Sequence, residues 1–348
     1  MGYYDELRDL SLTVEAVEYE RLERETPKFT RATTVVSLVG PEDEEGEPAV
    51  GRGEDVTYEA DHHPIPDKFD LAGEYTLDSF SEKIAELDLF PDATPDHEAF
   101  RNYRRWAFES AALDLALRQA DTHLGAELGR EYDPVRFVAS PSLGDPSSAE
   151  PIRRWHERNP ELEFKLDVDE DWSSELLTEL ADAGVRVVDF KAHYEDEEVA
   201  GGADADLYRQ VAEAFPEAVL EDPAWNDDTA TALDSARDRV SWDYPITGVE
   251  SVRDLPFEPS WLNVKPSRFG SVASLLETVE FCEERTIRMY GGGQFELAVG
   301  RRQLHLLASL FYPESPNDVA PTQYNDPDPP ADLPRSPLAV GDVRGFRW

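Results

Sequence analysis

The stretch VRVVDFKAHY, residues 185–194, contains one complete unit of the pattern that decides the fold. An apolar run of the kind found in buried strands ends in an acid, Asp189, and a lysine, Lys191. Both side chains would point to the same side of a strand, because strand side chains alternate. The segment DADLYRQVAEAF, residues 204–215, follows with a helical pattern. A strand that ends in charged residues and is followed by a helix is therefore the unit to look for elsewhere.

The same alternation of short apolar strand and helix recurs over residues 135–321. The other strand segments are VRFVASPSL, LEFKLDVD, AVLEDPAW, RVSWDYPITGVES, SWLNVKPSRFGS and IRMYGGGQFE, with a last strand expected near YPESPNDVAP. Such alternation predicts a parallel sheet with helical crossovers. So many units favour a closed barrel of the TIM type over an open doubly wound sheet. We therefore expect an α/β barrel as the catalytic domain, residues 135–321.

The first part of the chain, residues 1–134, has a different pattern. SLTVEAVEYERLE and FTRATTVVSLVG alternate apolar and polar residues, as half-buried antiparallel strands do. A long helical pattern follows from His97 to Leu128, and its small and apolar residues predict one closely packed face. These residues are Ala107, Ala111, Ala112, Leu115 and Leu117. We expect an α+β unit here, completed by residues 322–348, whose proline-rich segment YNDPDPPADLPRSPL packs back on it.

The composition limits the classes of partner. The formal net charge is −42, and only six of the 33 basic residues are lysine. A surface of this charge repels phosphate backbones and anionic lipid, so we expect neither nucleic acid nor membrane as a partner. Acidic, lysine-poor chains resemble proteins of salt-accumulating halophiles. The start of the chain has no signal-peptide pattern and no apolar run of membrane-spanning length, so a cytoplasmic location is expected.

The expected strand ends carry most of the chemistry. In a parallel barrel, active groups project from the carboxyl ends of the strands into one mouth. Read in order, these ends carry Lys165, Asp167, Asp189, Lys191, Glu221, Asp222, Glu250 and Lys265, followed by Gln294 and Glu296 after a triple glycine. Every lysine after residue 83 belongs to this set. The scarce lysines therefore gather where a barrel places its active site.

Three carboxylates on neighbouring strands, Asp189, Glu221 and Glu250, would repel each other unless a hard divalent cation lay among them. This predicts a Mg²⁺ site that also leaves room for the carboxylate of a small-molecule substrate. Lys165 and Lys265 would flank the metal, where a partly desolvated lysine can act as a general base. The metal would stabilise the charge that develops when the α-proton of the substrate leaves.

With these residues in view, the chain resembles the enolase superfamily, in the branch of muconate lactonizing enzyme and o-succinylbenzoate synthase. RWAFESAALDLALRQADTHLGAELG is similar to the family's helix ahead of the barrel, and EDP, VES and NVKP resemble its strand-end motifs. The resemblance implies a capping domain before a modified (β/α)7β barrel, with Asp189, Glu221 and Glu250 as metal ligands and Lys265 as acid or base. It implies a Mg²⁺-dependent lyase or isomerase that works by dehydration, cycloisomerisation or epimerisation. Barrels of this family commonly associate, which is compatible with a homo-oligomer.

The chain also departs from the family pattern. The family places two lysines as KxK at the end of the second strand, whereas this chain has Lys165-Leu166-Asp167, so Asp167 competes with Lys165 as the second acid or base. Lys191 stands where a neutral polar residue is usual, and either pairs with the carboxylates or contacts the substrate. Gln294 and Glu296 are further candidate substrate contacts. The alternative to an enzyme is an enolase-like barrel without catalysis that binds a ligand or partner.

Overall fold

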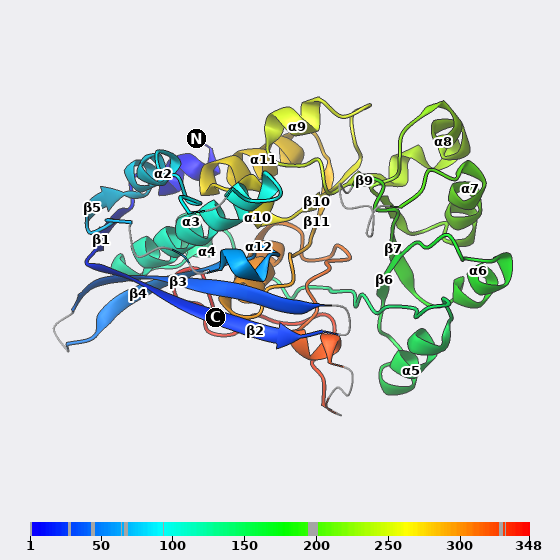
Figure 1. The fold of residues 1–348 in the computed structure, drawn as a ribbon, viewed down its shortest axis with the longest axis horizontal. Coiled ribbons are helices and arrows are strands. Elements are labelled where there is room, and N and C mark those ends of the chain that lie inside the picture. Colours follow the sequence, from blue (N-terminus) through cyan, green and yellow to red (C-terminus); the bar gives the residue numbers. More distant parts are fainter. Residues whose placement is uncertain are drawn as a thin grey trace.

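A computed structural model describes residues 2–26, 29–42, 46–63, 65, 69–92, 94–193, 201–326, 330 and 332–348. In Figure 1, the first sheets and helices of the chain lie on the left and helices α5 to α8 lie on the right. Strands β6 to β11 run between them. Tyr194 of the stretch quoted above lies outside the described residues.

The N-terminal unit contains two antiparallel sheets, one with strand order β2-β3-β4 and one that pairs β1 with β5. These strands are β1 (Ser11–Val14), β2 (Ala16–Glu25), β3 (Thr30–Glu42), β4 (Pro48–Asp55) and β5 (Gly73–Thr76). Burial along β2 follows the alternation of its sequence, because one face of this edge strand turns toward the core and the other toward water.

Helices and a short 3₁₀ turn pack against these sheets in the described part of this unit. They are α1 (Tyr3–Leu7), α2 (Leu77–Ala85), α3 (Ala99–Gln119), α4 (Leu124–Glu127) and η1 (Ala60–His62). Helix α3 packs against β4 so closely that a Cβ on Gly53 would lie 2.0 Å from the carbonyl oxygen of Ala107, and one on Gly51 2.1 Å from that of Ala111. Glycine on the strand and alanine on the helix make this approach sterically feasible. The predicted close-packing face of α3 is thus confirmed, and all five of its residues are buried.

The second unit is a curved parallel sheet with strand order β11-β10-β9-β8-β7-β6. Its strands are β6 (Phe164–Asp167), β7 (Val185–Asp189), β8 (Val219–Glu221), β9 (Val240–Trp242), β10 (Trp261–Val264) and β11 (Arg288–Gly291). Single parallel bridges close the ring, since Ala139 pairs with Phe164 of β6 and Phe137 pairs with Asn317. The amide of Asp318 in turn donates to the carbonyl of Gly291, at the end of β11. These contacts supply the first and last staves of the barrel.

Helices follow the staves in the predicted order. They are α5 (Glu150–Arg158), α6 (Ser174–Leu180), α7 (Ala205–Ala214), α8 (Asp227–Ala232), α9 (Val249–Arg253), α10 (Pro266–Phe269), α11 (Val272–Glu284) and α12 (Val299–Phe311), with 3₁₀ turns η2 (Asp234–Arg239) and η3 (Thr322–Asn325). The expected fold, an α/β modified TIM barrel (β/α)7β with an N-terminal α+β capping domain, is confirmed. The exact division at residue 134 stays a prediction.

Buried polar contacts join the capping unit to the barrel. Glu54 at the end of β4 accepts hydrogen bonds from the amides of Leu297, Ala298 and Gly300, at the start of α12. Arg31 of β3 is fully buried and donates to backbone carbonyl oxygens, including that of Gln294. Hydrogen bonds from the cap therefore hold the loop after β11, which lies beside the mouth of the barrel.

The C-terminal segment returns to the capping unit. The amide of Phe346 donates to Asp114 of α3, and its ring packs edge-on against Trp106 of the same helix. The assignment of residues 322–348 to the capping domain as a whole remains a prediction. Along the described chain, no helix combines the length and apolar character that crossing a membrane requires.

Candidate active site

Five consecutive barrel strands deliver charged side chains to one end of the sheet. Asp189 and Glu221 end their strands, Asp243 and Lys265 directly follow theirs, and Lys165 lies two residues before the end of its strand. All five side chains are buried, with at most 6% exposure. They are Lys165, Asp189, Glu221, Asp243 and Lys265. Burying this many charges is costly unless they are paired with each other, so the geometry of the pairs decides what the cluster can do.

Lys165 lies between two of the acids. Its Nζ is 2.6 Å from Oε1 of Glu221 and 3.1 Å from Oδ2 of Asp189. Burial alone would lower the pKa of Lys165, but the two carboxylates outweigh burial and hold that pKa well above its usual range. Lys165 is therefore a fixed ammonium ion within the cluster.

Glu221 accepts hydrogen bonds on both of its oxygens. Nδ2 of Asn263 donates a hydrogen bond to Oε1 at 3.1 Å, and the hydroxyl of Tyr290 donates one to Oε2 at 2.6 Å. Burial, together with repulsion from Asp189 and Asp243, nevertheless raises the pKa of Glu221 to about 7. The acids thus concentrate more negative charge at this point than Lys165 balances.

Asp243, which directly follows β9, pairs with Lys265 and Arg268. Its Oδ2 lies 2.7 Å from Nζ of Lys265 and 3.2 Å from Nη2 of Arg268. Burial opposes the ionisation of Asp243, but Arg268 and Lys265 overcome it and lower the pKa to about 2. Asp243 is therefore a carboxylate at any physiological pH.

Asp222 supports this arrangement from the end of β8. Its φ of +47° lies in the left-handed region, and its two oxygens accept the amides of Asp243 at 2.7 Å and Tyr244 at 2.8 Å. Burial and the neighbouring acids raise the pKa of Asp222 well above its ordinary value. A strained backbone that two hydrogen bonds hold in place is typical of a functional site, and here it orients the exit from β9.

Asp167 and Lys191 form a separate pair beside the cluster. Nζ of Lys191 lies 2.6 Å from Oδ2 of Asp167, and the side chains retain 25% and 50% exposure. Burial opposes both charges, but each side chain favours the ionised form of the other, which lowers the pKa of Asp167 and raises that of Lys191. Lys191 also has a left-handed backbone, with φ of +51°, and its amide donates to Asp189. The pair stands at the rim of the site, ionised and partly accessible.

Gln294 and Glu296 lie where the cap meets the loop after β11. The amide of Gln294 donates to Oε1 of Glu296 at 2.7 Å, and the hydroxyl of Tyr58 from the cap reaches Oε1 of Gln294 at 3.3 Å. Oε2 of Glu296 lies 3.6 Å from a nitrogen of Arg301. These contacts are to the loop itself, to the cap and to α12, and a role of Gln294 and Glu296 in substrate binding remains a prediction.

Glu250 does not join the acids. It lies in helix α9 with its side chain 80% exposed, and it forms an ion pair with Arg253 one turn further along that helix. The segment VES was expected to end a strand, whereas β9 already ends at Trp242. Asp243, in the sequence SWDYP, takes the position that had been expected of Glu250, and this placement corrects the sequence-based expectation.

The residues fit a divalent cation by their chemistry. Asp189, Glu221 and Asp243 offer carboxylate oxygens from consecutive strands, which are the donors that Mg²⁺ prefers. The raised pKa of Glu221 indicates that an additional positive charge would stabilise its ionised form. Within the residues that the structure describes, no three acidic, histidine or cysteine side chains are already arranged around one metal position. Lysine ammonium groups occupy the places next to these acids instead.

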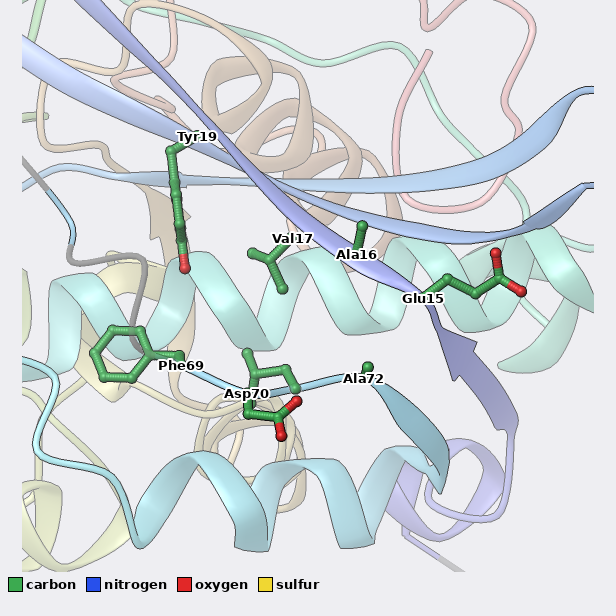
Figure 2. A pocket seen from close by; sticks show the side chains of 8 residues that line it. Glu15, Ala16, Val17, Tyr19, Phe69, Asp70 and Ala72 are labelled. Carbon is green, nitrogen blue, oxygen red and sulfur yellow. The ribbon is translucent and has the colours of Figure 1, made fainter.

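A different hollow, of about 270 Å³, lies in the cap between β2 and residues 69–72 (Figure 2). Ala16, Val17 and Tyr19 of β2 form one side, with Phe69 and Asp70 opposite. None of the candidate site residues lines it. This hollow is therefore separate from the cluster of charged strand ends.

Comparison with solved structures places this geometry in a known fold. A protein from Listeria innocua Clip11262, described as a member of the enolase superfamily, matches with 19% identity, 89% of this chain and 83% of that chain covered, and a TM-score of 0.59. Muconate cycloisomerase from Pseudomonas fluorescens matches with 18% identity, 97% and 96% coverage and a TM-score of 0.67. Dipeptide epimerase from Methylococcus capsulatus, complexed with a Mg ion, matches with 17% identity, 88% and 89% coverage and a TM-score of 0.64. At these identities the likeness establishes the fold.

Two family models match the sequence itself. The model described as "Domain of unknown function (DUF8230) N-terminal domain" matches residues 5–127, and that described as "Domain of unknown function (DUF8230) C-terminal domain" matches residues 131–326. The search among curated proteins gives no match. The chain belongs to the DUF8230 family, and it has the fold of the enolase superfamily.

Proposed function

We propose that this protein is a Mg²⁺-dependent enzyme that removes the α-proton of a carboxylate substrate and forms an enediolate. The observation that carries the proposal is the order of charges along the barrel, where lysines on β6 and after β10 enclose the acids Asp189, Glu221 and Asp243. An enediolate carries more negative charge than the carboxylate from which it forms, so buried cations around the reacting centre favour it over the ground state.

Asp189, Glu221 and Asp243 would hold the metal, with Asp243 in place of the expected Glu250. When bound, Mg²⁺ would polarise the substrate carboxylate and stabilise the charge on its oxygens. The dipeptide epimerase with a bound Mg ion shares the fold and supports this assignment.

Lys265 is the proposed acid and base, and its Nζ would take or return the α-proton. It is buried and lies beside Asp243, the acid nearest to the later strands. Lys165 has the different role of a permanent cation, because its amine is held as ammonium by Asp189 and Glu221. Asp167 and Lys191 form a further charged pair at the rim. Lys191 would bind the substrate, and Asp167 would hold the side chain of Lys191 in place.

The step after proton removal decides between elimination, cycloisomerisation and epimerisation. Each of these outcomes starts from the same enediolate, so the cluster itself is compatible with all three. Groups at the junction of cap and barrel, such as Tyr58 and Gln294, would face the rest of the substrate and select among these outcomes.

A second function, ligand binding without catalysis, is favoured by one observation. Asp189 and Glu221 share Lys165, Asp243 pairs with Lys265 and Asp167 pairs with Lys191, so lysines already contact all four of these acids without any metal. A catalytic base needs an amine that can lose its proton, whereas a barrel that only binds a ligand can keep every one of these lysines as a paired ammonium ion.

Exchange of substrate protons with D₂O discriminates the two functions. Acyl amino acids, sugar acids and succinylbenzoate precursors would be incubated with the protein and Mg²⁺, and deuterium at the α-carbon would be measured by mass spectrometry. The enzyme hypothesis expects exchange that stops when the metal is chelated and falls by about 10²–10⁴-fold in Lys265→Met. Absence of exchange across the panel would favour the binding protein.

A further inference from the structure

A cavity of about 380 Å³ lies beside the cluster, between the cap and the barrel. The first turn of α3 forms one wall, with Ala99, Arg101 and Tyr103. Tyr244 and Arg268, from the loops after β9 and β10, form the other. A space of this size can accept a small organic molecule or one end of a larger one.

Arg268 connects this cavity to the candidate active site. The side chain is 3% exposed, and its Nη2 lies 3.2 Å from Oδ2 of Asp243. Its guanidinium carbon also lies 4.9 Å from the ring centroid of Tyr244. Because Asp243 already has Lys265 at 2.7 Å, one carboxylate here faces two cations. Arg268 therefore brings a buried guanidinium group from the candidate active site to the wall of the cavity.

The wall around Arg268 is held by the packing of the two domains. Nδ2 of Asn102 on α3 donates to the backbone carbonyl of Arg268 at 2.8 Å. Gly270, at φ of +73°, lies so near that a Cβ there would be 2.8 Å from Oδ1 of Asn102. A bulkier residue would separate the helix from this loop, so the cavity has a defined shape.

Several of the lining residues carry hydrogen-bond donors. Arg101 and Arg268 contribute guanidinium groups, and Tyr103 and Tyr244 contribute hydroxyl groups. Burial raises the pKa of Tyr103, which keeps its hydroxyl protonated at neutral pH. Among the described residues that line the cavity, the acid is Glu98, which is largely exposed and pairs with Arg101. A cavity lined by two arginines suits a carboxylate, sulfate or phosphate, because guanidinium groups bind these anions through paired hydrogen bonds.

Arg101 can exchange its present partners at little cost. It contacts Glu98 at 3.2 Å and Asp88 at 3.5 Å, and the two acids are 82% and 64% exposed. Ion pairs this exposed contribute little to stability. An oxyanion in the cavity would therefore compete well for Arg101.

We propose that this cavity binds an oxyanion, and that the bound anion draws Arg268 away from Asp243. Loss of the Arg268 contact would leave Asp243 more available to a divalent cation. This second part rests on the proposed Mg²⁺ site, whereas anion binding itself does not. By linkage, the anion and Mg²⁺ strengthen each other's binding by the same factor.

Calorimetric titration of sulfate into the metal-free protein tests the site directly. We expect one saturable site per chain. Arg101→Met should weaken sulfate binding about tenfold, because a hydrogen bond to a charged group is lost. Ala99→Leu, which fills the cavity without removing a charge, should weaken sulfate binding as well.

Arg153→Met is the matched control. Arg153 forms a similar exposed ion pair with Glu150, three residues before it, and lies far along the chain from the cavity. Its sulfate binding should equal that of the unmodified protein.

Glutarate in place of sulfate identifies the source of the oxyanion. Tighter binding of glutarate that also depends on Arg101 would assign the oxyanion to one end of a longer molecule, whereas tighter binding of sulfate would assign it to a free anion. Either result supports the site. No saturable binding of either probe, or binding that Arg101→Met leaves unchanged, would overturn it.

The coupling has its own measurement. Titration of Mg²⁺ with saturating sulfate should show an affinity about fivefold or more above that without sulfate. An affinity that sulfate leaves unchanged or lowers would overturn the coupling. If the proposed enzyme function fails, sulfate binding that depends on Arg101 remains while proton exchange is absent, so the two failures are distinguishable.

Discussion

Nζ of Lys165 lies 2.6 Å from Oε1 of Glu221, in the interior of the barrel mouth and 3.1 Å from Asp189. Lys165→Met would remove this cation and leave two buried carboxylates next to each other. We expect the free energy of unfolding of the metal-free protein to fall by about 3–5 kcal/mol, as when a buried ion pair loses one partner. Urea unfolding followed by circular dichroism measures this loss, and added Mg²⁺ should recover part of it.

Lys265→Met is the matched comparison for that substitution. Asp243 keeps Arg268 at 3.2 Å when Lys265 is removed, so this carboxylate stays compensated. The loss of stability should be clearly smaller than in Lys165→Met, although proton exchange is lost. If both variants lost the same free energy of unfolding, Lys165 would not compensate more buried negative charge than Lys265 does.

Asp243 and Glu250 offer a direct comparison of two acids seven residues apart. Asp243→Asn should weaken Mg²⁺ binding by at least the ~10–100-fold that loss of a supporting group costs at metal sites. Glu250→Gln removes an exposed acid from α9, so Mg²⁺ affinity should stay unchanged and stability should change by no more than about 0.5 kcal/mol. Calorimetric titration of both variants decides the point. Loss of Mg²⁺ binding in Glu250→Gln would restore the sequence-based assignment.

The periodicity of the sequence predicted an α/β barrel after an α+β unit, and the resemblance to the enolase superfamily added the (β/α)7β form and the capping role of the first unit. Strand segments that end in charged residues, such as FKLD and VRVVD, recur between helical patterns, and a parallel barrel is the arrangement that buries them all. The positions of Asp189 and Glu221 followed, because each is the last residue of its strand.

The remaining site residues depend on contacts that the sequence does not display. Strand β9 has only three residues, VSW, so its end was placed too late and Asp243 was missed. Tyr290 meets Glu221 across the barrel, 69 residues away in sequence, and no local pattern signals such a contact. Asn263 is the exception, since a polar residue in the apolar strand WLNV marks a side chain with a buried partner.

Glu54 makes the junction of cap and barrel sensitive to pH. Burial, reinforced by nearby Glu296, raises the pKa of Glu54 above the ordinary value of 4.5, although backbone amides at the start of α12 oppose the shift. A carboxyl group whose pKa is raised on folding contributes stability that is complete below its unfolded pKa and is lost as pH rises through its folded pKa.

Glu54→Gln cannot ionise and tests this effect. The difference in free energy of unfolding between the unmodified protein and Glu54→Gln should move in favour of the variant as pH rises above 4.5. Thermal unfolding of both proteins at a series of pH values measures the difference. A difference that is independent of pH, or that favours the unmodified protein as pH rises, would contradict the raised pKa.

The excess of acidic residues predicts a strong dependence of stability on salt. With a net charge of −42, repulsion among surface carboxylates opposes the compact state, and dissolved ions screen it. The screening length falls from about 10 Å at 0.1 M salt to about 3 Å at 1 M. We therefore expect the unfolding temperature to rise steadily as KCl is increased over this range.

Comparison of KCl with tetramethylammonium chloride at equal ionic strength separates general screening from binding of small cations by carboxylates. If screening alone acts, both salts should raise the unfolding temperature equally, because the Debye length depends only on ionic strength. A larger effect of KCl would indicate cations held by acidic groups, since the bulky organic cation cannot approach carboxylate oxygens as closely. An unfolding temperature that stays constant or falls in both salts would show that repulsion among the 75 acidic residues does not limit stability, and that the acidity serves another purpose.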